Sequence, residues 1–150
     1  MWQAIENCLA TLRAAEWMPV IAARVLIGIF FCVSGGTKLF VPAKFRVMEQ
    51  TLEQSHIPFA HANAIFVSLV EFACGAGLVV GLLTPLCAAV LVVDMIVAIA
   101  TNRIHSIQAA GALAWLDDFL YLPEVLYVLI LVWLIFTGPG RYSLDGIIQR

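Results

Sequence analysis

The chain has 150 residues, about the length of one domain, and 63% of them are hydrophobic while 12% are charged. Eight basic and ten acidic side chains cannot cover the surface of a soluble domain, and the mean hydropathy of +0.99 agrees. The composition therefore excludes a soluble enzyme and a disordered chain. The formal charge of −2 offers no basic patch for nucleic acid. We expect one membrane domain over residues 1–150.

Four apolar runs approach the length of about 20 residues that a transmembrane helix needs. They cover residues 19–40, 63–80, 85–101 and 119–137. The pattern predicts an all-α, four-helix transmembrane bundle with both termini on one side of the membrane. Gly81 is expected to end the second helix, and Thr84-Pro85 to cap and open the third, which makes these helices antiparallel neighbours. Pro123 either opens the fourth helix or kinks a longer one.

The long polar stretch between the first two runs has helical periodicity. Pro42 can open a helix, after which Phe45, Met48 and Leu52 recur on one side. The other side carries Lys44, Arg46, Glu49 and Glu53. This pattern predicts a short amphipathic helix in the membrane interface over residues 42–55, with a solvated loop as the alternative.

The distribution of basic residues decides orientation only weakly. The terminal side is expected to carry Arg13, Arg24, Arg141 and Arg150, and the opposite side Lys38, Lys44, Arg46 and Arg103. This is nearly a tie under the positive-inside rule, and we place the termini in the cytoplasm.

Ionisable residues inside the apolar runs need a physical reason, because each charge at bilayer depth costs a few kcal/mol. Glu71 and Asp94 both lie near the middle of their helices, and Arg24 is the cation closest to them in depth. We expect these three residues to form an interior polar site. The alternative is a structural network that fixes helix register. The first helix should turn one face into the bundle, formed by Arg24, Gly28, Phe31, Gly35 and Lys38.

Two further features leave alternatives open. Glu124 is either a first-turn carboxylate favoured by the helix dipole or a buried group that faces Lys38 at the same depth. The cysteines show no metal-ligand spacing, and we expect them to act as small hydrophobic residues; they are Cys8, Cys32, Cys74 and Cys87. The sequence carries no haem, flavin or metal signature.

Several motifs resemble those of DoxX-family membrane proteins. The first helix is similar in Arg24, Gly28, Phe31, Ser34-Gly35 and Lys38-Leu39, and the following segment in Pro42-Ala43-Lys44-Phe45 and Ile57-Pro58. Glu71, Gly75, Gly81 and Thr84 resemble the family's second helix and turn. The run Gly138-Pro139-Gly140-Arg141-Tyr142-Ser143-Leu144-Asp145 resembles its C-terminal signature. The resemblance covers about residues 20–146 and is weaker over 102–118.

The resemblance implies a bacterial inner-membrane protein linked to quinone-dependent oxidation of sulfur compounds or to redox stress. We therefore expect a membrane subunit of a quinone-linked oxidoreductase system, whose electrons come from a soluble redox partner. Glu71 and Asp94 would relay protons, while Arg24 would hold a carboxylate ionised or donate to a quinone oxygen. Lys38 and Glu124 would serve the quinone site from the other interface.

Two other functions are weighed against this one. The chain could be a non-catalytic scaffold that recruits a soluble enzyme through residues 42–55, or a small proton- or cation-coupled transporter. For each of these functions we expect the protein to lie in the lipid bilayer, either as a monomer or as a homo-oligomer.

Overall fold

The computed structural model describes residues 2, 6, 17–108, 111–140 and 142–148. Cys8, Arg13, Arg141 and Arg150, which the sequence interpretation used, lie outside these residues. The described part of the chain is helical and contains no strand, so the all-α prediction is confirmed. Its elements are α2 (Trp17–Phe40), α3 (Pro42–Gln54), α4 (Ala60–Val80), α5 (Thr84–Thr101), the 3₁₀ helix η1 (Arg103–Ser106), α6 (Ala112–Leu120), α7 (Pro123–Thr137) and α8 (Leu144–Ile148).

Three helical segments are each long and apolar enough to cross a membrane: α2, α4, and α5 continued by η1. The pair α6 and α7 makes a fourth span if it is counted together, although it bends by 61°. The predicted span 119–137 is corrected here, because Pro123 opens α7 and Leu122 before it is extended. Proline disfavours helical geometry in the residue that precedes it, which separates α6 from α7. Pro123 is thus a first-turn proline.

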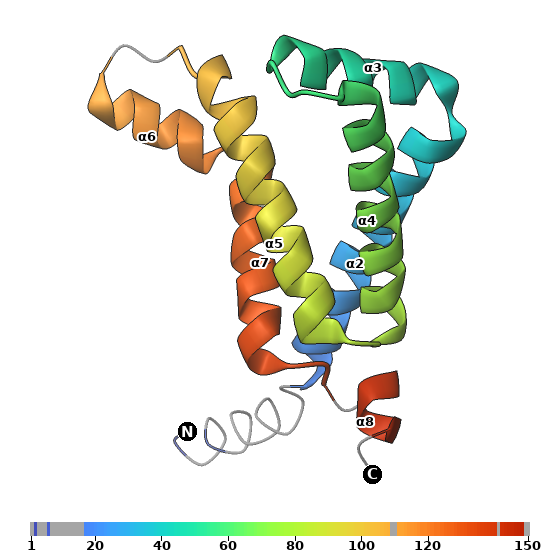
Figure 1. Cartoon of the computed structure of the whole chain (residues 1–150). Helices are drawn as coiled ribbons and strands as arrows, with labels where there is room; N and C mark the ends of the chain where they lie inside the picture. The colour runs from blue at the N-terminus through green and yellow to red at the C-terminus, as the bar shows by residue number, and fades with distance from the viewer. Residues whose placement is uncertain (1, 3–5, 7–16, 109–110, 141, 149–150) are drawn as a thin grey trace.

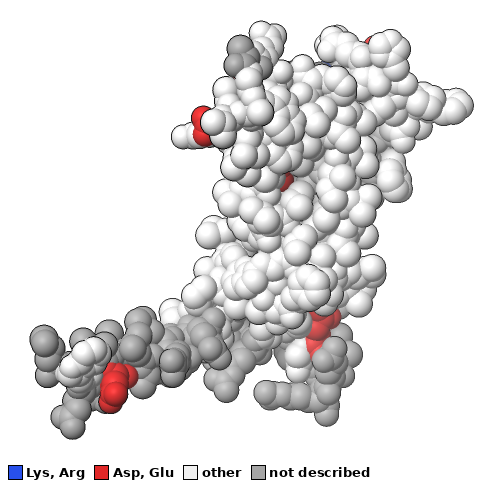
Figure 2. All heavy atoms as spheres, turned by 90° about the vertical axis from the view of Figure 1, so that its left-hand side faces the viewer, with Lys and Arg blue, Asp and Glu red and all other residues white. Residues whose placement is uncertain are grey.

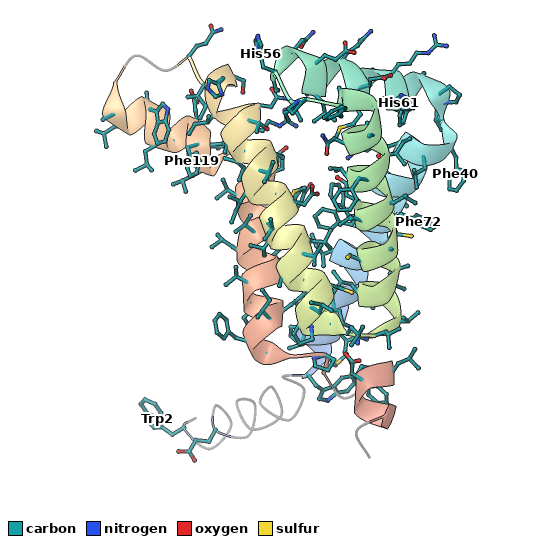
Figure 3. All side chains as sticks on the ribbon, in the orientation of Figure 1. Trp2, Phe40, His56, His61, Phe72 and Phe119 are labelled. Carbon is teal, nitrogen blue, oxygen red and sulfur yellow. The ribbon has the colours of Figure 1, made fainter. Side chains whose placement is uncertain are left out.

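The segment between the first two spans forms α3, with Pro42 in its first turn and Leu52 buried. α3 lies across the end of the bundle, over the first turns of α4 (Figure 1). His61 of α4 lies beneath it (Figure 3), with its Nδ1 2.8 Å from Oε1 of Glu49 and its ring 5.2 Å from that of Phe45. The predicted helix is confirmed, and its apolar side faces the bundle.

The long helices form two pairs, α2 with α4 and α5 with α7, which the α4–α5 turn connects. The pairs diverge toward the end that carries α3 and α6, whereas the beginning of α2 and helix α8 lie at the other end (Figure 1). Glycines bring α2 and α4 together: a Cβ at Gly35 would lie 2.5 Å from the backbone N of Phe72, and one at Gly28 2.9 Å from the carbonyl O of Gly75. Small residues at such crossings let helix backbones approach.

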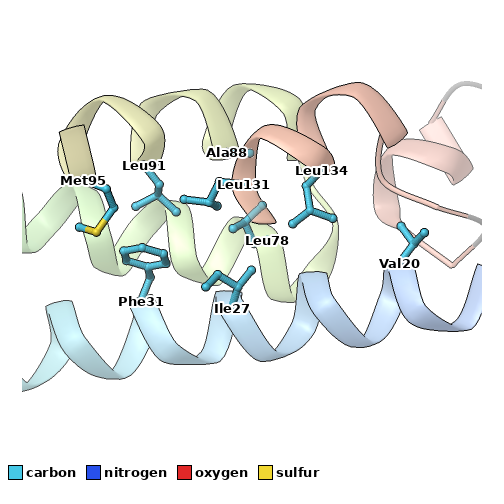
Figure 4. Packing of buried hydrophobic residues seen from close by; sticks show 9 residues of the cluster. All are labelled: Val20, Ile27, Phe31, Leu78, Ala88, Leu91, Met95, Leu131 and Leu134. Carbon is cyan, nitrogen blue, oxygen red and sulfur yellow. The ribbon is translucent and has the colours of Figure 1, made fainter. Parts of the chain in front are cut away.

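The predicted inward face of α2 is confirmed, since Arg24, Gly28, Phe31 and Gly35 are buried. The apolar core packs between the two helix pairs, as Figure 4 shows, and comprises Val20, Ile27, Phe31, Leu78, Ala88, Leu91, Met95, Leu131 and Leu134. The outside of the bundle is apolar too. Leu26 and Leu129 are more than half exposed, and Figure 2 shows a side face almost free of charged atoms between the two ends. Such a surface suits lipid.

Candidate functional site

The most deeply placed ion pair joins α2 to α4. The ammonium Nζ of Lys38 donates to both carboxylate oxygens of Glu71 at 2.7 Å, and the hydroxyl of Ser34 donates to Oε2 at 3.1 Å. The side chain of Glu71 is 4% exposed and that of Lys38 23%. Close packing fixes this geometry, because a Cβ at Gly35 would lie 3.0 Å from Cβ of Glu71. Both carboxylate oxygens of Glu71 therefore accept hydrogen bonds from side chains of α2.

A cavity of about 520 Å³ lies where the two helix pairs diverge. α2 and α4 line one wall and α5 and α7 the other. α3 closes one end of the cavity with residues that include Met48 and Leu52, and Ser55, which follows α3, also lines it. Most of the non-ionisable side chains that line the cavity are apolar. The ionisable side chains that line it are three basic and three acidic, namely Lys38, Lys44, Arg103, Glu71, Asp94 and Glu124.

The opposite wall carries two carboxylates with free acceptor capacity. Nε of Arg103 donates to Oε1 of Glu124 at 2.7 Å, while Oε2 of Glu124 is buried without a hydrogen-bond partner. Oδ2 of Asp94 is likewise buried and has no partner. Glu124 is 8% exposed, whereas the side chain of Arg103 is 49% exposed, so this ion pair connects the cavity to the outside. An ionised carboxylate only accepts hydrogen bonds, so both oxygens can receive a donor.

The cavity also reaches the lateral surface of the bundle. Phe30 of α2 and Val97 of α5 both line it, and they are 41% and 48% exposed. The ring of Phe30 lies 4.5 Å from that of Tyr127 on α7, which also lines the cavity. An apolar molecule in the bilayer would thus meet apolar and aromatic side chains before the ionisable groups.

The structure separates Arg24 from the carboxylates that it was expected to join. Nη2 of Arg24 donates to the backbone carbonyl of Tyr142 at 2.7 Å, and its guanidinium lies against Gly81, where no Cβ could be accommodated. Gly81 is ten residues from Glu71, about 15 Å along α4. The expectation that Arg24 is the nearest cation is wrong, because Lys38 occupies that place. Arg24 anchors the segment after α7.

The structure combines the two predicted positions of Glu124, a first-turn carboxylate and a buried group. Glu124 lies in the first turn of α7 and is also buried, so both descriptions of its position apply. Its partner, however, is Arg103 and not Lys38. The sequence interpretation used Arg103 only as an orientation charge. Its position two residues after the end of the predicted span 85–101 was the available signal.

Asp145 is a second residue whose role the sequence interpretation missed. Its carboxylate accepts hydrogen bonds from the backbone N–H groups of Leu83 at 2.7 Å and Thr84 at 3.0 Å, so it caps α5. The predicted cap by Thr84 is corrected: Thr84 is the first residue of α5, and its hydroxyl is buried without a partner. The N–H groups of Thr84 and Leu83 hold the pKa of Asp145 below its ordinary value, and Arg24 contributes to this.

The three cysteines that the structure describes are not among the residues that line the cavity. Cys74 and Cys87 pack against the apolar core, and Cys32, Cys74 and Cys87 are free thiols. Within the described residues, no group of three or more His, Cys, Asp or Glu side chains is arranged to hold a metal ion.

Comparison with known proteins agrees with the motifs in α2 and α4. The sequence model of the DoxX family matches residues 20–106. An uncharacterized membrane protein of Mycobacterium tuberculosis is 32% identical over 136 residues, which covers 87% of this chain and 82% of the relative. No solved structure gives a significant match. The match and the apolar helices lead to one conclusion: the chain is a membrane protein of the DoxX family.

Proposed function

We propose that this protein is the membrane subunit of a quinone-linked redox system and that its cavity receives the head group of a quinone. The observation that carries the proposal is the ionisable cavity at the divergent end of the bundle, which is open toward lipid at Phe30 and Val97. Intramembrane ionisable groups that face a cavity mark substrate or proton pathways by default. The alternative is an ion-pair network that only fixes helix register. It explains Lys38 and Glu71, which pair with each other, but not the unpartnered oxygens of Asp94 and Glu124.

The cavity suits a neutral molecule with a polar head. Its volume of about 520 Å³ falls in the range of small-molecule sites, about 300–1,000 Å³. The three basic and three acidic side chains that line it leave no formal net charge, so nothing in this balance favours an ion. Lys38 and the hydroxyl of Tyr127 supply donors to a ring oxygen, while Phe30 and Val97 face the part of the ligand that stays in lipid.

The ionisable groups have distinct tasks in this proposal. A bound quinone takes up two electrons and two protons, and the electrons come from a soluble redox partner. Asp94 and Glu124 hold protons at the cavity wall, and Glu124 exchanges them with the outside beside the half-exposed Arg103. The buried Lys38–Glu71 pair orients the head group. Arg24 has no part in these steps, because it lies at the opposite end of the bundle.

We place this system in a bacterial inner membrane with cytoplasmic termini. The bacterial relative is described as a membrane protein, which supports the location. The soluble partner would then meet either the end of the bundle that carries α3 or the opposite end, and a cysteine-labelling topology assay distinguishes the two.

Equilibrium binding tests the proposal. The protein is reconstituted in lipid nanodiscs and titrated with decylubiquinone, and quenching of tryptophan fluorescence gives the Kd. We expect saturable binding that Asp94→Leu and Glu124→Leu each weaken about tenfold, because a carboxyl group that holds a proton donates a hydrogen bond to a quinone oxygen and leucine cannot. Asp117→Leu is the matched control, because Asp117 is exposed on α6. Unsaturable quenching, or equal affinity in all variants, contradicts the proposal. Co-purification of a stoichiometric soluble protein without quinone binding supports a scaffold instead.

A further inference from the structure

A second cavity, the outer groove, lies where α3 meets the end of α2 and the beginning of α4. Its volume is about 450 Å³, and it shares no lining residue with the cavity between the helix pairs. Its polar lining comes from α3 and α4 and comprises Arg46, Glu49 and His61. Its apolar lining comes from all three helices and includes Leu39, Phe45 and Ile65. The outer groove therefore has a polar part and an apolar part.

The polar part leaves one cation available to a ligand. Nδ1 of His61 lies 2.8 Å from Oε1 of Glu49, and because a carboxylate only accepts hydrogen bonds, Nδ1 is the donor. This contact joins Glu49 to α4. Arg46 is exposed, and no ion pair between the described residues includes it. Its guanidinium is therefore free to bind an anion, and the planar arrangement of its N–H groups matches a phosphate.

The apolar part continues along α4 into the membrane. Ile65 lies about one helical turn after His61, and Leu69 about one turn further on the same face. Ile65 is 38% exposed and Leu69 50%, so this face of α4 meets lipid. α4 runs from α3 toward the opposite end of the bundle (Figure 1), so each of these side chains lies deeper than the one before it.

We propose that the outer groove binds a phospholipid of the surrounding membrane, with its phosphate at Arg46 and an acyl chain along Ile65 and Leu69. The apolar helix α2 ends and α4 begins beside α3, so the head groups of the bilayer lie at the level of α3. A phospholipid has an anionic phosphate at this level and a hydrocarbon chain directly below it. It thus matches both the free cation and the exposed apolar face. The proposal does not rest on the quinone function.

Two other occupants would use only part of these features. A free phosphate compound would bind Arg46 and leave the apolar face of α4 uncovered. A second copy of the chain would cover Ile65 and Leu69 and would need an acidic group for Arg46. The test distinguishes both from a phospholipid.

Native mass spectrometry of the detergent-solubilised protein resolves the chain with and without one bound lipid. The protein is titrated with phosphatidylglycerol, with a diacylglycerol that lacks the phosphate, and with glycerol 3-phosphate, which lacks the chains. We expect saturable binding of one phosphatidylglycerol, and binding about tenfold weaker or less for the other two compounds. Arg46→Gln should weaken phosphatidylglycerol about tenfold, the effect of losing a charge-assisted hydrogen bond. Lys44→Gln is the matched control, because Lys44 is exposed on the same helix but does not line the outer groove.

Four results would overturn the proposal. Equal weakening in Arg46→Gln and Lys44→Gln would show a diffuse attraction of α3 for anionic lipid. Equal affinity for phosphatidylglycerol and diacylglycerol would show that the phosphate is not recognised. Competition by an equal concentration of glycerol 3-phosphate would assign the outer groove to a free phosphate compound. A lipid-free dimer that Ile65→Asn abolishes would assign it to a second copy of the chain. Circular dichroism of each variant verifies that a change in binding is not a loss of fold.

Discussion

The ammonium of Lys38 lies 2.7 Å from both carboxylate oxygens of Glu71, although the two residues are 33 positions apart and belong to different helices. Glu71 is buried and Lys38 is partly exposed. In an apolar surrounding, each of these charges depends on the other, because an isolated buried ion loses its hydration without compensation. The pair therefore both fixes the register of α2 on α4 and sets the polar character of one cavity wall.

Breaking this pair from one side should strongly destabilise the protein. Lys38→Met leaves Glu71 as an uncompensated buried carboxylate, and we expect the free energy of unfolding to fall by about 3–5 kcal/mol. Chemical unfolding in detergent micelles, followed by circular dichroism, measures the change. Glu49→Gln breaks the exposed contact with His61 and is the control, with an expected loss below about 1 kcal/mol. Equal, small losses in both variants would show that the buried pair contributes no more than a surface contact.

The register of α2 against α4 explains why the sequence predicted the inward residues but not their partners. Helical periodicity identified the face of α2 that is buried, because it depends only on spacing within one helix. The pairing of charges depends on how far one helix is shifted along the other. Gly35 lies level with Glu71, and Gly81 level with Arg24. This shift follows from close backbone contact at the glycines, which spacing within either helix cannot reveal.

Replacing Asp94 should have the opposite effect on stability from replacing Lys38. Oδ2 of Asp94 is buried without a partner, and such a group costs about 1–3 kcal/mol. Asp94→Leu is therefore expected to leave the unfolding free energy unchanged or to raise it by about that amount. The same unfolding assay, run beside the exposed control Asp117→Leu, measures it. A clear loss of stability would mean that Asp94 has a structural partner, and would weaken the case for a binding site.

The glycines at the α2–α4 crossing should tolerate no side chain. A Cβ at Gly75 would collide with the backbone of Cys32 and lie 2.8 Å from the carbonyl O of Gly28, and backbone atoms cannot move aside independently. We expect Gly75→Ala to cost about 1–3 kcal/mol of unfolding free energy, the usual range for overpacking. Gly36→Ala is the matched control, since its Cβ would meet only the ring of Phe72 at 3.3 Å. Similar thermal stability of the two variants would contradict the close approach of the helices.

The cap that Asp145 forms on α5 should make stability depend on acidity. Hydrogen bonds from Thr84 and Leu83 lower the pKa of Asp145 in the folded protein, so its contribution is present above the ordinary Asp pKa of about 3.9 and is lost as the pH falls through the lowered value. Asp145→Ala should cost about 0.5–2 kcal/mol at neutral pH, as for other lost helix caps.

Thermal unfolding of the wild type and of Asp145→Ala from pH 7 to pH 3 checks this expectation. The difference in Tm between them should narrow toward acid pH, because protonation weakens the wild-type cap. A difference that is constant or grows toward acid pH would contradict it.

Asp145 and Arg103 also show which part of the site was beyond prediction from sequence. Asp145 lies 61 positions after Thr84, so no local pattern connects it with the start of α5. Arg103 and Glu124 are 21 positions apart and meet because Pro123 starts α7 beside the end of α5. Apolar run length predicted the spans, since a bilayer requires it. Contacts between chain segments far apart in sequence depend on how the helices pack, and only the fold reveals them.

The central claim, that the cavity between the helix pairs is a quinone site, is tested most directly by mapping where a photoreactive quinone attaches. An azido derivative of decylubiquinone is irradiated with the nanodisc-bound protein, and the labelled peptides are identified by mass spectrometry with and without excess unmodified quinone. The account predicts labels on cavity residues such as Phe30, Asp94 and Tyr127, suppressed by the competitor and reduced in Glu124→Leu. Labels spread over lipid-facing side chains such as Leu26 and Leu129, unaffected by the competitor, would contradict it.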